Sequence, residues 1–308
     1  MTQQWPDLRV LELLIAISEH GSLSAGARAV GMAQPNASRA VAGLERDLGV
    51  TLLARLPRGS QLSDAGFALV GHARLVVSAA QALLDASGHL AVDRPAQLRV
   101  AASMTVAEHL LPEWLVALRD VEPRISVRLT AVNSSGVYDA VEAGECDLGF
   151  VETPQRRTGL RSVVVAHDRL VVVAHPTHPW ADKARRGGSV SAEELAATPL
   201  VVRERGSGTR KAFDEALRSF HPVAPALELE SIAAIRSTVR AGGDPAVLSE
   251  LAVAWSLAQG ELVRVPVTGV TMRREIRAVW QGHRAPGAAE RLVAVAQQAA
   301  AQRSPRSR

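Results

Sequence analysis

The chain has a single cysteine, Cys146, among its 308 residues, which excludes an internal disulfide framework and a thiol-rich metal site. Aromatic residues make up only 3% of the sequence, so the cores must consist of valine, leucine, isoleucine and alanine. No stretch approaches the roughly 18 continuous apolar residues of a membrane helix. The opening residues, MTQQWPDLRV, lack a basic leader followed by an apolar run. These absences predict a cytoplasmic protein without a membrane partner.

Motifs that would indicate an enzyme are also missing. The chain has no G-x-S-x-G sequence, no Walker motif and no dinucleotide fingerprint, and residues 206–209 are too short to count as one. His167, His175 and His178 lack the spacing of metal ligands. Cys146 resembles a small buried hydrophobic residue more than a nucleophile. We therefore expect no cofactor, no metal and no enzymatic activity.

The composition that is present fits a globular protein of two or three domains. Apolar residues make up 47% and charged residues 21%, so the chain should fold. A formal charge of +4 is compatible with a nucleic-acid partner but does not require one. Five arginines nevertheless gather between Gly21 and Ser63, where only Glu45 and Asp47 oppose them. The basic excess is therefore local and N-terminal.

The N-terminal segment predicts three short helices. Leu8–His20 has amphipathic spacing, and Ser24 is a suitable N-cap for a helix Ala25–Val30 that ends at Gly31. A third helix begins at Gln34-Pro35, where the missing N–H of proline costs nothing. Two short helices around a tight Gly31-Met32 turn are the layout of a helix-turn-helix, whose second helix enters the major groove of DNA.

The third helix has two different faces. Its apolar stripe at spacings of four and three consists of Ala37, Val41, Leu44 and Leu48. Its opposite face presents Pro35, Ser38, Arg39, Ala42 and Arg46. Small polar and basic side chains at a helix start suit base edges and phosphates. The alternative is a helical hairpin with a solvated basic face, which the short turn and the small polar side chains make less favourable.

A basic wing should follow the third helix. Thr51–Arg55 and Gln61–Ser63 are two expected strands around the basic, glycine-containing turn at residues 56–60, which would lie against a phosphate backbone. Ser63 or Asp64 should cap the next helix. The complete set of expected DNA contacts is Ser24, Gln34, Pro35, Asn36, Ser38, Arg39, Arg55 and Arg58.

One long helix is expected from Ala65 to Ser87. Its apolar seam alternates spacings of four and three and consists of Leu69, Ala73, Val76, Ala80 and Leu83. Such a seam suits packing against a second copy of the chain, and the alternative is a helix that lies on its own domain. A linker at Gly88–Ala96 should follow.

Beyond the linker, strands and helices alternate, which predicts an α/β architecture with parallel pairing. The first segments are Leu98–Ala102, Val106–Asp120, Ser126–Val132, Ser135–Ala143 and Asp147–Glu152. The valine-rich stretch Leu160–His175 should form two strands, and Pro176–Ser189 a polar loop. The later segments are Glu193–Ala197, Pro199–Glu204, Thr209–Phe220, Ser231–Ala241, Ala246–Ser249, Leu262–Val265, Glu275–Gln281 and Ala288–Gln302.

A ligand site is expected beyond the carboxyl ends of these strands. Three strand ends are rich in small polar groups and precede helices, whose N-termini attract anions. The expected effector-binding residues are Ser103, Met104, Thr105, Asn133, Ser134, Glu152, Arg203, Ser207 and Thr209. Ordinary N-capping is the alternative at each single serine or threonine, but three such strand ends in one domain favour a small pocket that binds an anion.

These motifs together resemble LysR-type transcriptional regulators. The match is strongest from Leu11 to Gly66, with ISEHGSLSAGARAVGMAQPNASRAVAGLERDLGVTLLAR and LSDAG, and it continues in LRVAAS, DLGFVE, GSGTR and LVRVPV. The resemblance implies an N-terminal, mostly helical winged helix-turn-helix, a long linker helix, and a two-lobed α/β effector domain like periplasmic binding proteins. The family has serine or threonine where this chain has Ala33, which removes a helix cap that also touches phosphate.

The resemblance also implies the domain limits. The DNA-binding domain would span residues 1–63, the dimerisation helix and hinge 64–96, and the effector domain 97–302, followed by a loose basic tail at 303–308. Lobe one would comprise 97–165 and 267–302, and lobe two 166–266, with the chain crossing near His167 and Val265. RERGSGTR and the NSS after the second strand most resemble the branch that senses small oxyanions or small metabolites in sulfur and carbon metabolism.

The expected function is therefore sequence-specific transcription regulation controlled by a small anionic metabolite. The expected partners are promoter DNA, that effector, further copies of the chain as a dimer or a dimer of dimers, and RNA polymerase. One alternative is an enzyme or solute-binding protein with the same two-lobed fold, for which Cys146 would be the candidate nucleophile. Another is an architectural DNA-binding protein without a ligand.

Overall fold

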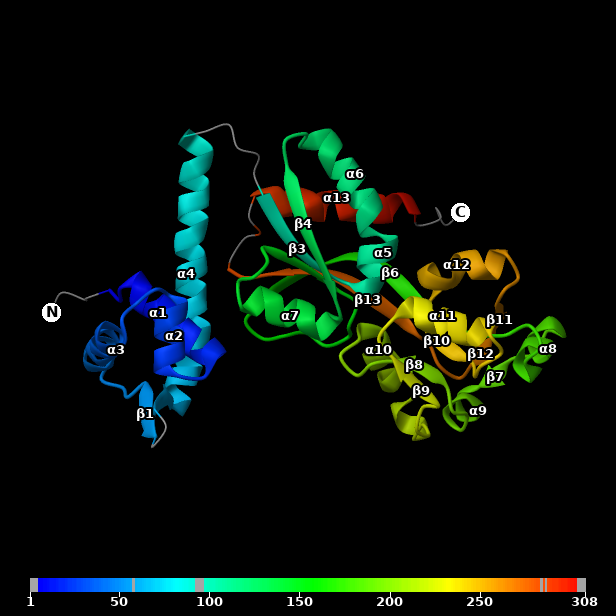
Figure 1. The fold of residues 1–308 in the computed structure, drawn as a ribbon. Helices are drawn as coiled ribbons and strands as arrows, with labels where there is room; N and C mark the ends of the chain where they lie inside the picture. Colours follow the sequence, from blue (N-terminus) through cyan, green and yellow to red (C-terminus); the bar gives the residue numbers. More distant parts are fainter. Residues whose placement is uncertain (1–4, 57–58, 92–96, 283–284, 286, 304–308) are drawn as a thin grey trace. The chain divides into compact units, whose positions relative to one another are not determined.

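The structure is a computed structural model that describes residues 5–56, 59–91, 97–282, 285 and 287–303. It divides into two compact units, an N-terminal unit formed by the first 95 residues and a C-terminal unit formed by nearly all that follow (Figure 1). Each unit has its own hydrophobic clusters. Within the described residues, no helix is long and apolar enough to cross a membrane.

The N-terminal unit begins with three helices, α1 (Leu8–His20), α2 (Leu23–Ala29) and α3 (Gln34–Leu48). The first and third match the predicted limits. The N-cap predicted for the second helix is wrong: Ser22, not Ser24, accepts the N–H of Ala25 at 3.3 Å, so α2 starts at Leu23. The buried faces of all three helices meet in one cluster that contains Leu14, Ile17 and Val41.

A two-stranded wing follows, with β1 (Leu53–Leu56) antiparallel to β2 (Gly59–Leu62). The carboxylate of Glu45 near the end of α3 fastens this wing to the helices. Its Oε1 accepts the backbone N–H groups of Leu52 at 2.7 Å and Leu53 at 2.9 Å. The wing is therefore held by a side chain of the helix that precedes it.

The long helix α4 runs from Asp64 to Ala91. Ser63 begins it, because its Oγ accepts the N–H of Gly66 at 3.0 Å. The predicted linker start at Gly88 is wrong, since the helix continues to Ala91 and residues 92–96 lie outside the described part of the chain.

The predicted dimer seam on α4 divides into two parts. Ala73 is buried and Leu69 packs beside it in the cluster of the N-terminal unit itself, as the alternative of a helix on its own domain requires. Val76 and Leu83 are 48% and 70% exposed. Only the distal part of the seam is therefore open to another chain.

Gly66 of α4 tests how tightly this helix packs. An added Cβ there would lie 2.4 Å from the backbone oxygen of Leu52, whereas Gly71 in the same helix has nothing within 4 Å. We expect Gly66→Ala to lower the free energy of unfolding by about 1–3 kcal/mol. The matched variant Gly71→Ala should raise it by up to about 1 kcal/mol, because alanine is the better helix former. Urea unfolding of the full chain checks both, and a Gly66→Ala protein as stable as the parent would contradict the close packing.

The C-terminal unit is built on one nine-stranded sheet with the order β4-β3-β5-β13-β6-β10-β8-β9, and β11 pairs with β6. Strand β6 (Arg161–Ala174) belongs to both halves of this sheet. Its first part pairs with β13 (Arg273–Trp280), and its last part with β10 (Ala246–Ser249) and β11 (Val263–Val265). The prediction of two strands at residues 160–175 is therefore wrong: one 14-residue strand joins the lobes.

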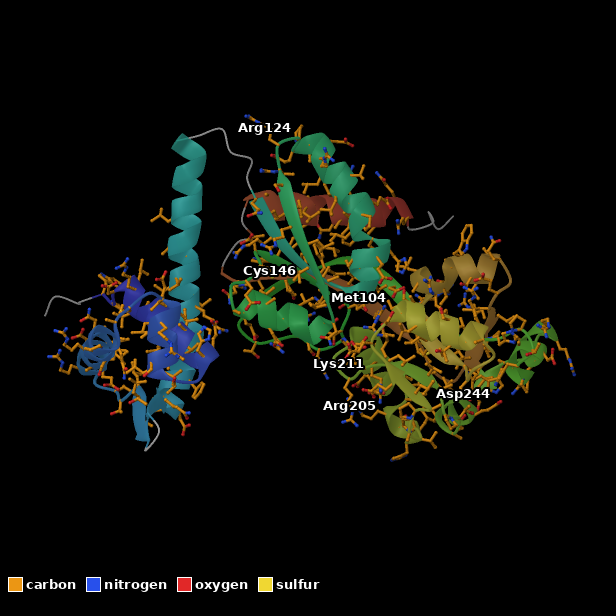
Figure 2. The ribbon with its side chains drawn as sticks, viewed as in Figure 1. Met104, Arg124, Cys146, Arg205, Lys211 and Asp244 are labelled. Atoms are coloured by element: carbon orange, nitrogen blue, oxygen red, sulfur yellow. The ribbon has the colours of Figure 1, made fainter. Side chains whose placement is uncertain are left out.

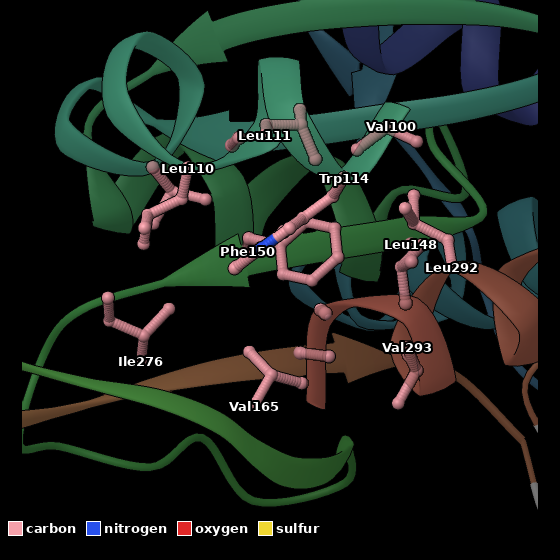
Figure 3. Close-up of a cluster of buried hydrophobic side chains, with 14 of the residues drawn as sticks. Val100, Leu110, Leu111, Trp114, Leu148, Phe150, Val165, Ile276, Leu292 and Val293 are labelled. Carbon is pink, nitrogen blue, oxygen red and sulfur yellow. The ribbon is translucent and has the colours of Figure 1, made fainter. Parts of the chain in front are cut away.

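Lobe one contains the parallel strands β3 (Gln97–Ser103), β4 (Ser126–Val132) and β5 (Leu148–Val151). Its helices are α5 (Met104–His109), α6 (Leu111–Val121), α7 (Ser134–Glu142) and α13 (Gly287–Arg303). The core of lobe one surrounds Trp114, whose ring centroid lies 5.3 Å from that of Phe150 (Figure 3). The single helix predicted at residues 106–120 is interrupted at Leu110, just before Pro112, which cannot donate a helical hydrogen bond.

Lobe two contains β10 together with the strands β8 (Val201–Arg203) and β9 (Leu227–Leu229). Its helices are α8 (Pro179–Arg185), α9 (Ala192–Ala196), α10 (Gly208–Ala216), α11 (Ile232–Arg240) and α12 (Glu250–Ala258), with a 3-10 turn η1 (Arg218–Phe220). The short strands β7 (Val190–Ser191) and β12 (Val267–Thr268) pair with each other. The sequence missed β9 and α12 and predicted a loop where α8 lies.

The second crossing between the lobes is later than predicted. Val267, Val270 and Met272 pack on the core of lobe two, so the chain has not left that lobe at Val265. It returns where β13 begins, at Arg273, which pairs with Arg169 of β6. Both crossings therefore lie side by side on the two central strands.

Candidate DNA-binding helix and effector cleft

Helix α3 exposes the side chains that the sequence assigns to DNA. Its buried side chains are Ala37, Val41 and Leu44. Its exposed residues include Gln34, Pro35, Asn36, Ser38, Arg39, Ala42 and Arg46. Leu48, predicted as part of the buried stripe, is 42% exposed. The polar face of α3 is therefore free within its own unit.

Arg39 is oriented along the first turn of α3. Its Nη2 donates to Oδ1 of Asn36 at 2.6 Å, and its Nε to the carbonyl oxygen of Pro35 at 3.4 Å. These contacts hold the guanidinium near the N-terminus of the helix, where bases and phosphates are contacted in helix-turn-helix proteins. Ser24 is half-buried on α2 and caps nothing.

The wing residues stay predictions. Arg58 lies outside the described residues, and Arg55 belongs to β1 but its side chain is not described.

The start of α3 lacks a side-chain cap. Ala33 occupies the N-cap position and makes no capping hydrogen bond. We expect Ala33→Ser to raise the free energy of unfolding of the N-terminal unit by about 1 kcal/mol, because a hydroxyl there can accept an unpaired N–H. The control Ala42→Ser, on the exposed middle of the same helix, should lower it by about 0.5 kcal/mol. Thermal unfolding measures both, and equal effects would disprove the capping argument.

Four of the predicted effector residues lie together where the two lobes meet, namely Thr105, Ser134, Glu152 and Thr209. The backbone N–H of Ser135 in lobe one donates to the carbonyl oxygen of Gly206 in lobe two at 3.2 Å. An added Cβ on Gly208 would lie 2.7 Å from Oγ of Ser134 and 2.8 Å from Cγ of Glu152. Only glycine permits this approach, so the GSG sequence brings the start of α10 against lobe one.

The centre of this cleft is a guanidinium that the sequence did not single out. Arg274 on β13 has a side chain that is 1% exposed. Its Nε and Nη2 donate to Oδ2 of Asp168 at 2.8 and 2.6 Å, and its Nη1 to Oγ1 of Thr209 at 2.9 Å. Its Nη2 also lies 3.2 Å from Oε2 of Glu152 and donates to Oγ1 of Thr105 at 3.4 Å. One cation thus contacts both lobes.

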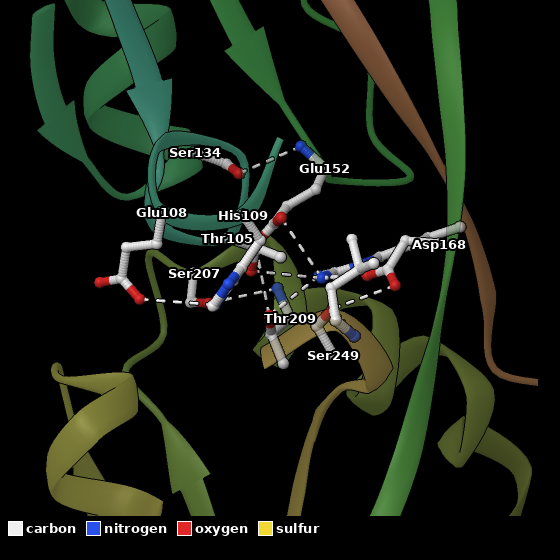
Figure 4. Close-up of polar contacts among 11 residues, drawn as sticks. Thr105, Glu108, His109, Ser134, Glu152, Asp168, Ser207, Thr209 and Ser249 are labelled. Atoms are coloured by element: carbon white, nitrogen blue, oxygen red, sulfur yellow. Dashed lines mark hydrogen bonds and ion pairs between the residues drawn. The ribbon is translucent and has the colours of Figure 1, made fainter. Parts of the chain in front are cut away.

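Two carboxylates share this cation. Thr105 and Thr209 donate their hydroxyls to Oε1 of Glu152 at 3.0 and 3.3 Å, and Ser249 donates to Oδ1 of Asp168 at 3.0 Å (Figure 4). Both carboxylates are buried. The network therefore places two carboxyl groups around one guanidinium inside the protein, where buried polar groups must be hydrogen-bonded.

Some buried polar atoms of the cleft have no hydrogen-bond partner among the described residues. They are Oγ of Ser103, Nη1 of Arg203, Oε2 of Glu152 and Nε2 of His109. The remaining guanidinium donors of Arg203 bind Glu204 at 2.8 and 3.0 Å, and Oε2 of Glu152 has only its ion pair with Arg274. Nε2 of His109 likewise lies 3.6 Å from Oε2 of Glu108, so Oγ of Ser103 and Nη1 of Arg203 are the atoms of this set with neither a hydrogen bond nor an ion pair. An unpaired buried polar atom costs about 1–3 kcal/mol, so a bound molecule would contribute most at these two atoms.

The other predicted effector residues divide between capping and packing. Asn133 Oδ1 accepts the N–H of Gly136 at 2.9 Å, and Ser207 Oγ that of Thr209 at 3.2 Å, so both act as helix caps. Ser103 precedes α5 but forms no cap hydrogen bond. Met104 packs against the Ile232 cluster of lobe two. Ser103 and Arg203 are therefore the predicted residues with unused polar groups.

Cys146 does not have the environment of a nucleophile. It precedes β5, whereas Met104 follows the parallel strand β3, so the two lie at opposite ends of the sheet (Figure 2). Burial of the thiol, and then the negative charge of Asp147, raises the pKa of Cys146 to about 12. The thiol is thus protonated at neutral pH. Burial also lowers the pKa of His109, which keeps its imidazole neutral beside the cleft.

No cluster of three metal-ligating side chains occurs in the described part of the chain.

Comparison with known proteins establishes the family. The LysR substrate binding domain matches residues 93–301, and the helix-turn-helix of bacterial regulatory proteins of the lysR family matches residues 8–67. A Mycobacterium tuberculosis HTH-type transcriptional regulator is 43% identical over 298 residues, covering 94% of this chain and 95% of that protein. The chain therefore belongs to the LysR family of DNA-binding transcriptional regulators, as predicted, and this family does not consist of enzymes.

Solved structures share the fold. CbnR, in a complex with its target DNA, has a TM-score of 0.63 at 23% identity and covers 95% of this chain and 99% of its own. The regulatory domain of CcmR from Synechocystis, in a complex with 2-PG, has a TM-score of 0.60 at 25% identity and covers 67% of this chain and 97% of its own. The predicted winged helix-turn-helix and two-lobed effector domain are confirmed.

The buried ion pairs of the cleft should stabilise the C-terminal unit. Asp168 is 2% exposed and pairs with Arg274, whereas Asp139 is 66% exposed and pairs with Arg157. We expect Asp168→Asn to lower the free energy of unfolding by about 3 kcal/mol, because it leaves a buried guanidinium with one carboxylate. The control Asp139→Asn should cost less than about 1 kcal/mol. Urea unfolding of the full chain distinguishes them, and a small loss for Asp168→Asn would mean that the network does not hold the lobes.

Proposed function

We propose that this regulator binds promoter DNA in the cytoplasm as a homodimer or a dimer of dimers, and that a small anionic molecule bound between its lobes controls it. The observation that carries the proposal is the buried polar network between the lobes, with Ser103 Oγ and Arg203 Nη1 unpaired. A guanidinium donor and a hydroxyl are each suited to a carboxylate, phosphate or sulfate oxygen.

Regulation by a ligand requires two arrangements of the lobes, and the network would stabilise the one in which they are in contact. Thr105 and Glu152 belong to lobe one, Thr209 to lobe two, and Arg274 joins them in the closed arrangement. A molecule shifts the equilibrium between closed and open lobes only if it binds one state better. An anion at Arg203 would add contacts to the closed state, which is the state that brings lobe two against Ser134.

The exposed face of α3 supports the DNA contact. CbnR, a structural neighbour, forms a complex with its target DNA. By that analogy, α3 of this chain enters the major groove with Gln34, Ser38 and Arg39 towards the bases. The exposed Val76 and Leu83 of α4 offer an apolar surface for a second copy. Paired helices would then read half-sites about 34 Å apart, or multiples of that distance.

A footprint on the promoter of the chain's own or a neighbouring operon tests the function. We expect a protected site, and Arg39→Ala should weaken binding by about 1–3 kcal/mol. The control Arg9→Ala removes the same charge from α1, where the residue is exposed and outside the expected contacts, so it should change binding little.

The same footprint repeated with small carboxylates, phosphate esters and sulfate tests the control by an anion. We expect one of them to alter the protected length, and Ser103→Ala to reduce that response without altering binding in its absence. A protected site that no small molecule changes would indicate a DNA-binding protein without a ligand, and no protected site would refute the regulator itself.

A further inference from the structure

A cavity in lobe one shares no residue with the effector site between the lobes. It has a volume of about 230 Å³ and is lined by Tyr138, Arg156, Arg157, Leu160, Arg161, Ser162 and Val279. Three of these residues are arginines from the short segment between β5 and the start of β6. The remaining lining is a hydroxyl and an apolar floor. The cavity therefore combines a cationic rim with a small hydrophobic base.

One wall of this cavity is rigidly built. Arg157 donates from Nη1 to Oδ1 of Asp139 at 2.6 Å, and its guanidinium lies 5.3 Å from the centroid of the Tyr138 ring. The buried Tyr138 in turn donates its hydroxyl to the carbonyl oxygen of Gln155 at 2.9 Å. A guanidinium held against an aromatic ring and a carboxylate loses little entropy when it also binds an anion.

The other two arginines have unused donors. The side chains of Arg156 and Arg161 are exposed, and neither forms a hydrogen bond or ion pair with the described residues. Since Asp139 offsets only one of the three guanidinium charges, the rim carries a net charge of +2. Like charges gathered around one hollow repel each other unless an anion joins them.

A further cation lies in the neighbouring lobe. Burial lowers the pKa of Lys211 on α10, the positive charge of Arg157 lowers it further, and the negative charge of Asp139 raises it. The Nζ of Lys211 donates to Oγ of Ser135 at 2.9 Å, so this cation is fixed against lobe one. A bound anion would relieve the repulsion on both sides of the lobe boundary.

We propose that this cavity is a second ligand site, which binds a small oxyanion carrying two or more negative charges, such as a phosphate monoester or a di- or tricarboxylate. Arginine recognises both groups through two parallel hydrogen bonds. The volume is below the roughly 300–1,000 Å³ of pockets for drug-sized molecules, so the ligand is small. Leu160 and Val279 would provide apolar contacts for a short carbon skeleton attached to the anionic groups.

Calorimetric titration of the full chain with inorganic phosphate, glycerol phosphate and citrate, at constant ionic strength, tests the second site. We expect one saturable site for at least one of these probes. The double variant R156Q/R161Q should weaken that binding by about tenfold or more, since hydrogen bonds to charged groups contribute about 1.5–3 kcal/mol. Binding of citrate alone would identify a carboxylate ligand, and binding of glycerol phosphate but not citrate a phosphate ester.

Two controls separate this site from general charge effects and from the cleft. R128Q/R186Q removes the same charge from two exposed arginines elsewhere in the unit and should leave the affinity unchanged. Ser103→Ala in the effector cleft should also leave it unchanged, which keeps this test independent of the function proposed above. No saturable binding, an equal loss in R128Q/R186Q, or loss in Ser103→Ala would each overturn the second site. A loss of DNA binding in R156Q/R161Q without any anion binding would assign these arginines to DNA instead.

Discussion

A buried guanidinium can persist only where carboxylates and hydroxyls surround it, and in this protein Arg274 is that group. It stands near the start of β13, where the chain returns from lobe two to lobe one. Asp168 stands at the other crossing, on β6, and the pair ties the two central strands together. Thr105, Glu152 and Thr209 share the same guanidinium. Separation of the lobes would therefore break these hydrogen bonds, and apolar contacts could not replace them.

The same constraint explains the chemistry around the cleft. Glycines at positions 206 and 208 allow α10 to approach lobe one without a side chain between them. That approach packs α10 against Glu152. Oγ of Ser103 and Nη1 of Arg203 are also buried without a hydrogen-bond partner among the described residues, which is costly. In the function proposed above, a ligand that satisfies those atoms favours this arrangement of the lobes. The DNA-binding helix needs no such network, since its polar face lies open.

Much of the fold could be predicted because local patterns decide it. The limits of α1, α3 and β4 follow from periodicity, caps and turn residues that lie within a few positions of each element. The errors fall where distant contacts decide. Arg161–Ala174 form one strand because strands of both half-sheets pair with it. The polar stretch that follows contains α8, whose Trp180 is buried. Ser22 rather than Ser24 caps α2. Gly26 of this helix packs closely against Ile17 of α1, a distant contact that helps to fix where α2 lies.

The sequence by itself determined the helix-turn-helix, the alternation of strands and helices and the polar strand ends, because each depends on spacing along the chain. Its resemblance to the LysR family implied the two lobes. Only the tertiary structure decided which side chain stands at the centre. Arg274 lies among several arginines in RREIR, and nothing local distinguishes it from Arg273 or Arg277. Its role depends on Asp168, more than a hundred residues earlier, reaching the same point. Spacing can predict that polar strand ends converge, but only the pairing of the strands decides which charged side chains meet.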